Sequence, residues 1–201
     1  AQVVKQADLL LAMQWRSHAF TDEQKARNVD YYERRTVRDS SLSACTQAVM
    51  CAEVGHLELA HDYTYETAFV DLRDLHDNTR DGLHMASLAG TWLALVAGFG
   101  GLRDDAGVLS LDPALPDGIS RLRFGLRWQG FRVTVDANHS EVTYTLRDGP
   151  DGRLMINHAG EDVELSTQSP TTLPTRRREP LLPTPPQPPG REPTHRREVA
   201  R

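Results

Sequence analysis

The spacing of core-type residues changes partway along this chain. Along residues 57–72 such residues recur at steps of three and four, which is the spacing of one packed helix face. They are Leu57, Ala60, His61, Thr64, Ala68 and Leu72. From residue 108 onward the step becomes two, which is typical of strands with one buried face. The chain therefore predicts a helical part followed by a β part.

Each part can be divided into elements. We expect helices over residues 3–20, 43–54 and 57–72, and a further helix that starts near Gly82. In the β part, apolar residues alternate with polar ones on both sides of Gln129-Gly130, so these runs predict a hairpin. Further short strands are expected at residues 142–146, 154–157 and 163–165.

Composition limits the class of protein. The chain has 201 residues, of which 39% are hydrophobic and 25% charged, and a net charge of −5, which fits one or two modest globular units. The apolar stretch at residues 85–99 is interrupted by polar residues and glycines and is too short for a membrane span. Cys45 and Cys51 should lie on different faces of one helix, which disfavours a disulfide and favours a cytoplasmic setting.

Two other ligand classes are not expected. The eight histidines of the chain match no metal-binding spacing, so no metal site is predicted. Arginines alternate with core residues in residues 121–128, but no aromatic stacking face accompanies them. We therefore expect neither a nucleic-acid partner nor a membrane partner.

Polar junctions precede two of the expected helices. Asp81 is a candidate N-cap for the helix after Gly82, which would place His84 in the first helical turn. Ser40 and Ser41 stand just before the helix at residues 44–54. Free backbone amides at a helix start favour an anion such as phosphate, although such residues also serve as ordinary caps.

Residues 31–103 carry a family resemblance. The run YYERRTVRDSSLSACTQAVMCAEVGHLELAHDYTYETAFVDLRDLHDNTRDGLHMASLAGTWLALVAGFGGLR resembles the end of the catalytic domain of glycoside hydrolase family 65, which contains maltose, trehalose and kojibiose phosphorylases and related hydrolases. The segment VVKQADLLL matches a lysine-glutamine segment of the same family. The resemblance extends over about the first 165 residues.

The resemblance implies roles for particular residues. Lys5 and Gln6 match the pair that contacts the glucosyl unit at the cleaved bond. Ser40 and Ser41 match the hydroxyl pair that holds inorganic phosphate in phosphorylases, and His84 matches the histidine that completes this anion site. No cofactor is implied, because inorganic phosphate is the co-substrate of a disaccharide. The carboxylate of Asp39 leaves open a cap or a general base at this place.

The resemblance also implies that the chain is a C-terminal fragment. It would hold the last helices of an (α/α)6 barrel and a small antiparallel β domain, without the glutamate that serves as general acid. The expected function is that of an inverting α-glucoside phosphorylase releasing β-glucose 1-phosphate, and the alternatives are a hydrolase or a noncatalytic carbohydrate-binding remnant. The chain alone should be inactive, and the full-length protein is expected to be a homodimer.

The last part of the chain has a different composition. Nine of the twelve prolines follow residue 169, together with several arginines, which is typical of a disordered segment. The expected domain organisation is therefore residues 1–103 for the helical part, 104–167 for the β domain and 168–201 for a disordered tail.

Overall fold

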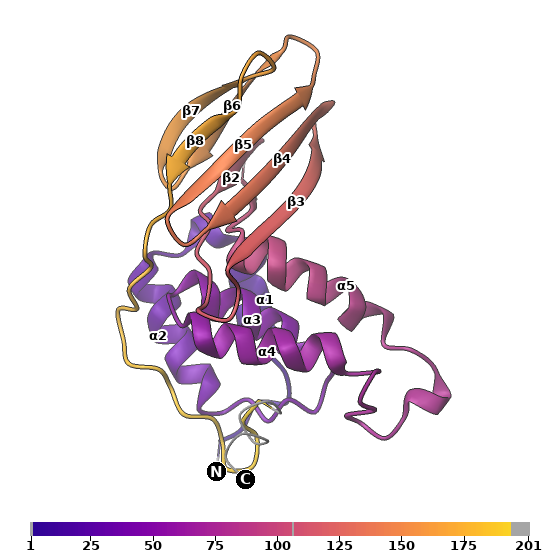
Figure 1. Ribbon diagram of the computed structural model, residues 1–201. Helices are drawn as coiled ribbons and strands as arrows, with labels where there is room; N and C mark the ends of the chain where they lie inside the picture. The colour runs from indigo at the N-terminus through magenta and orange to yellow at the C-terminus, as the bar shows by residue number, and fades with distance from the viewer. Residues whose placement is uncertain (1, 106, 194–201) are drawn as a thin grey trace. The chain divides into compact units, whose positions relative to one another are not determined.

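The structure, a computed structural model, describes residues 2–105 and 107–193. The chain divides into two compact units, Ala1–Gly98 with Glu179–Arg201 and Phe99–Arg178. The division therefore falls after residue 98, whereas the sequence predicted it after residue 103. The segment that follows the β unit is part of the helical unit again, as its yellow trace in Figure 1 shows.

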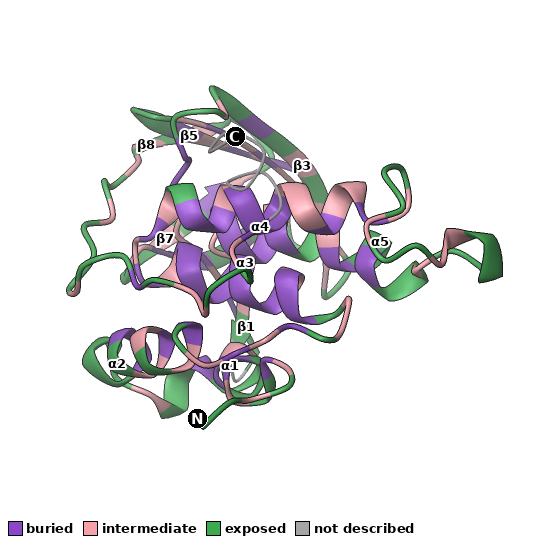
Figure 2. Cartoon of the chain, turned by 90° about the horizontal axis from the view of Figure 1, so that it is seen from below, coloured by how far each residue is buried: buried purple, intermediate pink, exposed green. Residues whose placement is uncertain are grey.

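The helical unit is built around α3. Its helices are α1 (Asp8–Trp15), α2 (Asp22–Glu33), α3 (Ser43–Glu53), α4 (Leu57–Phe69) and α5 (Met85–Leu93), with short turns η1 (Ser17–Ala19), η2 (Thr79–Asp81) and the π-helical η3 (Ala94–Phe99). Most residues of α3 are small or apolar, and the helix is buried from Ser43 to Ala52 except at Cys45 (Figure 2). A helix without a polar face has to be covered on all sides, so α3 forms the centre of this unit.

Two expectations for the helices were wrong. The first helix spans Asp8–Trp15, not residues 3–20, because Val4 forms a parallel bridge with Thr36 instead. The helix α2 was not expected at all, since its sequence is strongly polar. A capping box marks its start: the hydroxyl of Thr21 accepts from the backbone N–H of Gln24, whose side chain accepts from the N–H of Thr21.

The second unit is a sandwich of two four-stranded sheets, ordered β1-β2-β6-β7 and β3-β4-β5-β8. The strands are β1 (Arg103–Asp105), β2 (Val108–Leu111), β3 (Arg121–Trp128), β4 (Phe131–Asn138), β5 (Glu141–Asp148), β6 (Arg153–His158), β7 (Glu161–Ser166) and β8 (Thr171–Pro174). The expected hairpin at Gln129-Gly130 is present, and both residues have the positive φ of its tight turn. The sheets are mostly antiparallel, as expected, but β2 and β6 pair in parallel.

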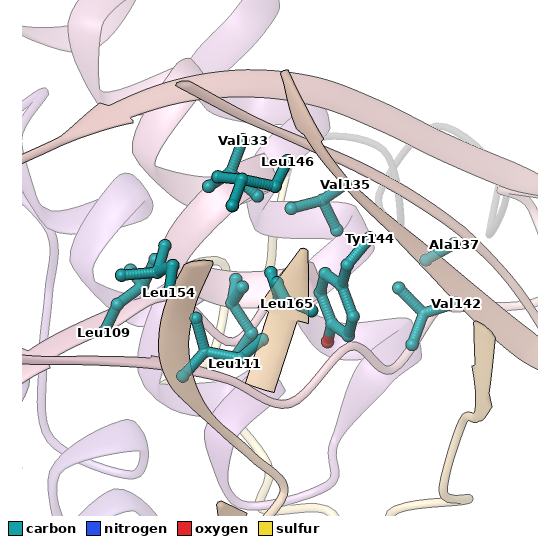
Figure 3. Close-up of a cluster of buried hydrophobic side chains, with 11 residues drawn as sticks. Leu109, Leu111, Val133, Val135, Ala137, Val142, Tyr144, Leu146, Leu154 and Leu165 are labelled. Carbon is teal, nitrogen blue, oxygen red and sulfur yellow. The ribbon is translucent and has the colours of Figure 1, made fainter. Parts of the chain in front are cut away.

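The core of the second unit lies between its two sheets (Figure 3). Leu109 and Leu111 of β2 face Val133 and Val135 of β4, and the ring of Tyr144 fills the same layer. These side chains occupy alternate positions of their strands. The period of two in the sequence therefore identified this buried face correctly.

The segment predicted to be a disordered tail contains ordered structure. Thr171–Pro174 forms β8 and pairs with β5, with Leu173 opposite Val142. Composition pointed to disorder, but this pairing satisfies the backbone of an edge segment and buries part of Leu173. Residues 175–193 are also described, while residues 194–201 of the expected tail lie outside the described residues.

Within the described part of the chain, no helix has the length and apolar character that crossing a membrane requires.

Candidate functional site

The starts of α3 and α5 are held next to each other. The hydroxyl of Ser87, in the first turn of α5, donates to the carbonyl oxygen of Ser41 at 3.0 Å. One turn further along α5, a Cβ on Gly90 would lie 2.6 Å from the Cβ of Cys45. Because residue 90 is a glycine, α5 can approach α3 this closely. The polar segments that precede α3 and α5 therefore lie next to each other.

His84 is fixed at the start of α5 by one carboxylate. Asp71 Oδ2 accepts from the backbone N–H of His84 at 2.9 Å, and Asp71 Oδ1 lies 2.6 Å from His84 Nδ1. The hydrogen bond to the ring is the main cause that lowers the pKa of Asp71. Because a carboxylate accepts at Nδ1, that nitrogen carries a proton and Nε2 is the ring atom left for a ligand.

The cap expected at Asp81 was wrong. Asp81 lies in η2, and the helix begins at Met85 with His84 as its N-cap residue. The difference arises in the loop before α5, where Asp74 Oδ1 accepts from the backbone N–H groups of Asn78 and Thr79, both at 2.9 Å. These bonds close the loop on itself and lower the pKa of Asp74.

A cavity of about 540 Å³ lies at the junction of these elements. It is lined by Arg38, Asp39, Ser40, Ser41, His76, Asn78, His84 and Arg191. The two serines come from the turn before α3, the histidines from the loop before α5, and Arg191 from the C-terminal segment. The lining therefore combines hydroxyl, imidazole and guanidinium donors with a single carboxylate, which is a lining suited to an oxyanion.

Arg38 forms one wall of the cavity and is held in place by Glu66 and Tyr63. Its residue exposure is only 8%, and its backbone has a φ of 56°, which is unusual for a residue with a side chain. Arg38 Nη1 donates to Glu66 Oε1 at 2.6 Å, and the guanidinium carbon lies 5.1 Å from the centre of the Tyr63 ring. The ion pair and the ring leave the arginine little freedom to move.

A buried carboxylate, that of Glu33, contacts the tyrosine that packs against Arg38. Glu33 accepts from Tyr63 Oη and from Gln47 Nε2, each at 2.5 Å. Burial raises the pKa of Glu33 and outweighs these hydrogen bonds. Tyr63 thus binds Glu33 through its hydroxyl, while its ring packs against the guanidinium of Arg38. These buried contacts hold Arg38 in place at the cavity.

The sequence-predicted site residues meet only in part. Ser40, Ser41 and His84 line the same cavity. Lys5 and Gln6 are not among its lining residues. The carbonyl oxygen of Lys5 accepts from the backbone N–H of Asp39 at 3.2 Å, and the side chain of Gln6 donates to Asp8, so this segment runs beside the cavity.

Sequence reasoning missed Asp71, His76, Arg38 and Arg191 as parts of the site. No motif singles out Asp71, because it lies 13 residues from the histidine that it holds. Arg191 stands in a segment whose composition predicted disorder. Among residues 2–105 and 107–193, no group of three or more His, Cys, Asp or Glu side chains is arranged to hold a metal ion.

Comparisons with known proteins match both units. The model of the glycosyl hydrolase family 65 central catalytic domain matches residues 1–93, and that of the family 65 C-terminal domain matches residues 102–165. An uncharacterized glycosyl hydrolase of Mycobacterium tuberculosis is 76% identical over the whole chain. The chain spans 26% of the length of that relative.

Enzymes with named activities are also similar. The α,α-trehalose phosphorylase of Thermoanaerobacter brockii is 40% identical over 74% of this chain and 19% of its own length. The kojibiose phosphorylase of Halothermothrix orenii is 39% identical over 78% of this chain and 20% of its own length. A solved structure of a candidate kojibiose phosphorylase from the human microbiome has a TM-score of 0.79 and 29% identity over 86% of this chain and 23% of its own.

Proposed function

Because this chain belongs to glycoside hydrolase family 65, we propose that it is the C-terminal part of an inverting α-glucoside phosphorylase. The parent enzyme, meaning the protein over the full length of such relatives, would cleave an α-linked glucose disaccharide with inorganic phosphate. Its products would be β-glucose 1-phosphate and glucose. The trehalose and kojibiose phosphorylases among the relatives support this reaction class.

The cavity lined by Ser40, Ser41 and His84 is the observation that carries the proposal. Phosphate attacks the anomeric carbon from the face opposite the leaving oxygen, so it needs a site with several donors in fixed positions. The two serine hydroxyls and the ring of His84 line this space, and Arg38 forms part of its wall. These groups would hold three phosphate oxygens and leave the fourth for attack.

His84 would contact phosphate through Nε2. With Nδ1 bound to Asp71, neutral His84 accepts a hydrogen bond at Nε2 from a protonated phosphate oxygen. In its imidazolium form, the same nitrogen donates to an unprotonated oxygen. Asp71 holds the ring in one orientation, so that Nε2 is the atom available to phosphate.

The attack needs a proton donor outside this chain. As the phosphate oxygen bonds to the anomeric carbon, the glycosidic bond breaks and the leaving oxygen takes a proton from the general acid. That glutamate would lie in the preceding part of the parent enzyme. Lys5 and Gln6, beside the cavity, would contact the glucosyl unit, and the 201-residue chain alone would not cleave glycosides.

The helical unit has the surface expected of a part of a larger barrel. Along α5 and just before it, Leu83, Met85, Leu88, Trp92 and Leu93 are exposed, with Met85 at 68% and Trp92 at 49%. Apolar side chains gathered on one helix usually face another element. In the parent enzyme, further barrel helices would cover them.

A hydrolase is the second candidate, since Asp39 lines the cavity and could activate a water molecule. However, Asp39 Oδ1 accepts from Arg191 Nη1 at 2.9 Å, so this carboxylate is already engaged by a guanidinium. This contact favours phosphate over water as the nucleophile. A carbohydrate-binding remnant would instead bind sugar or phosphate without turnover in the parent enzyme.

The test is an assay of the parent enzyme with trehalose, maltose and kojibiose, with and without inorganic phosphate. The phosphorylase proposal expects glucose 1-phosphate that depends on phosphate. Glucose released at the same rate without phosphate would identify a hydrolase instead. Turnover by the purified 201-residue chain would contradict the expectation that the proton donor lies outside it.

A further inference from the structure

The C-terminal segment reaches two sites in the helical unit. Gln187 Nε2 donates to Glu33 Oε2 at 3.3 Å, at the end of α2. Further along, Arg191 Nη1 donates to Asp39 Oδ1, and the carbonyl oxygen of Arg191 accepts from Arg38 Nη2. A turn closed by the N–H of Arg191 on the carbonyl oxygen of Pro188 includes Gly190 with a φ of 74°. The segment is therefore bound by its side chains and its backbone.

The segment lines the cavity without filling it. The volume of about 540 Å³ remains with Arg191 in place among its lining residues. The side chains of Asp39 and Arg191 are 51% and 46% exposed, so both are accessible to an entering ligand. An inhibitory segment would occupy the space, whereas this one contributes a donor to its wall.

The contact between Arg191 and Asp39 changes the charge that an anion meets. Asp39 directly precedes Ser40, and its carboxylate lines the cavity. A phosphate dianion beside an unpaired carboxylate is repelled, because like charges at short range oppose binding. The guanidinium of Arg191 offsets this charge, and its remaining N–H groups are donors of the kind that bind phosphate.

We propose that Arg191 is a phosphate-positioning residue, and that the C-terminal segment completes the phosphate site by pairing with Asp39. This inference rests on the proposed phosphorylase function. The segment after the β unit thus takes part in the site, although Arg191 and Asp39 are 152 residues apart in the sequence. A second contact, from Gln187 to buried Glu33, holds the segment in place.

The proposal is tested by the kinetics of the parent enzyme and its variants. The Michaelis constants for phosphate and for disaccharide would be measured separately at low ionic strength. For Arg191→Ala we expect the constant for phosphate to rise about fivefold, because the pair is partly exposed and screened, while the constant for disaccharide and kcat stay unchanged. Arg191→Lys should recover part of the loss, since it keeps the charge but not the paired donors.

Two further variants separate charge from folding. Asp39→Asn should lower the Michaelis constant for phosphate. The double variant Asp39→Asn with Arg191→Ala should have a constant closer to the wild-type value than Arg191→Ala alone, because the repelling charge is gone. The control is Arg153→Ala, which removes an arginine paired with Glu164 at 3.1 Å on the β unit and should change neither constant. If Arg191→Ala does not fold, Asp39→Asn and Arg191→Lys still decide the matter.

The outcomes separate this inference from the proposed function. Phosphate-dependent turnover with an unchanged phosphate constant in Arg191→Ala, or in Asp39→Asn, would overturn the inference alone. A lower constant in Arg191→Ala would overturn it as well, and would mean that the segment obstructs the site. Wild-type turnover without phosphate would overturn both. The effect of Arg191→Ala should shrink at high salt, as screening weakens charge contacts between exposed groups.

Discussion

Asp71 binds His84 twice, through Oδ2 to its backbone N–H at 2.9 Å and through Oδ1 to ring Nδ1 at 2.6 Å. The first contact starts α5 at a defined residue, and the second sets the tautomer and the direction of the ring. One carboxylate thus connects the beginning of a helix with the chemistry of the proposed phosphate site. The side chain of Asp71 is nearly buried, so water does not easily replace it.

Asp71→Asn should impair phosphate use in the parent enzyme. The amide is uncharged, so its hydrogen bond to Nδ1 is weaker and it holds the ring of His84 less firmly. We expect kcat/KM for phosphate to fall by roughly tenfold, which is the lower end of the effect of removing a partner that orients a metal-ligating histidine. His84→Ala should lose more. The control is Asp77→Asn in the same loop, and an equal loss there would argue for a general effect on the loop.

Gly90→Ala should destabilise the helical unit. The new Cβ would meet Cys45 Cβ at 2.6 Å, so α5 has to move away from α3. The expected cost is about 1–3 kcal/mol of unfolding free energy, which is typical of overpacking. Urea denaturation followed by circular dichroism measures it. Gly98→Ala is the matched control, because its Cβ would come no closer than 3.5 Å to Val49; similar losses in both would mean that helix approach is not the cause.

Glu33 should make the helical unit less stable as pH rises. Burial raises the pKa of Glu33 above the ordinary glutamate value of 4.5, so between pH 4.5 and the folded pKa the folded state binds more protons than the unfolded state. Its contribution to the unfolding free energy therefore falls as pH rises through this window and is constant above it. Glu33→Gln should remove this fall.

The Glu33 prediction is measured by urea denaturation of both proteins at a series of pH values. The quantity of interest is the difference in unfolding free energy between wild type and Glu33→Gln, which should grow in favour of the variant with increasing pH. Glu164→Gln, on β7 of the other unit, serves as control for the replacement of a carboxyl by an amide. A difference independent of pH would show that Glu33 titrates alike in both states.

Tyr144→Phe should destabilise the β unit. His158 Nε2 donates to the carbonyl oxygen of Pro174 at 3.2 Å, so its Nδ1 accepts from Tyr144 Oη at 2.9 Å. Without the hydroxyl, Nδ1 is left buried and unpaired, which costs about 1–3 kcal/mol. Denaturant unfolding provides the measurement. Tyr31→Phe removes an exposed hydroxyl and should change stability by less than about 0.5 kcal/mol; equal effects would exclude the buried bond as the cause.

The contacts around Tyr144 show why sequence patterns did not predict β8. The hydroxyl of Tyr144 on β5 contacts His158 Nδ1 on β6, and His158 Nε2 donates to the carbonyl oxygen of Pro174 at the end of β8. The proline content of the last segment predicted disorder, and local composition contains no sign of a partner. Pairing between β5 and β8 joins residues about 30 positions apart, as Thr143 and Thr172 do at a separation of 29.

Local patterns of the sequence by themselves determined the switch from helices to strands, the hairpin at Gln129-Gly130 and the buried face of β4 and β5. They could do so because periodicity and turn residues act over a few positions. The family was identified by resemblance, through the run at residues 31–103 and the segment VVKQADLLL.

Only the tertiary structure decided which residues share the cavity. Asp71, Arg38 and Arg191 carry no local signal, since each is placed by a partner distant in sequence: His84, Glu66 and Asp39. Close approach at Gly90 and burial of Glu33 depend on how helices pack. Such contacts form between residues that are distant in sequence and come together only when the helices pack, so local sequence patterns do not predict them.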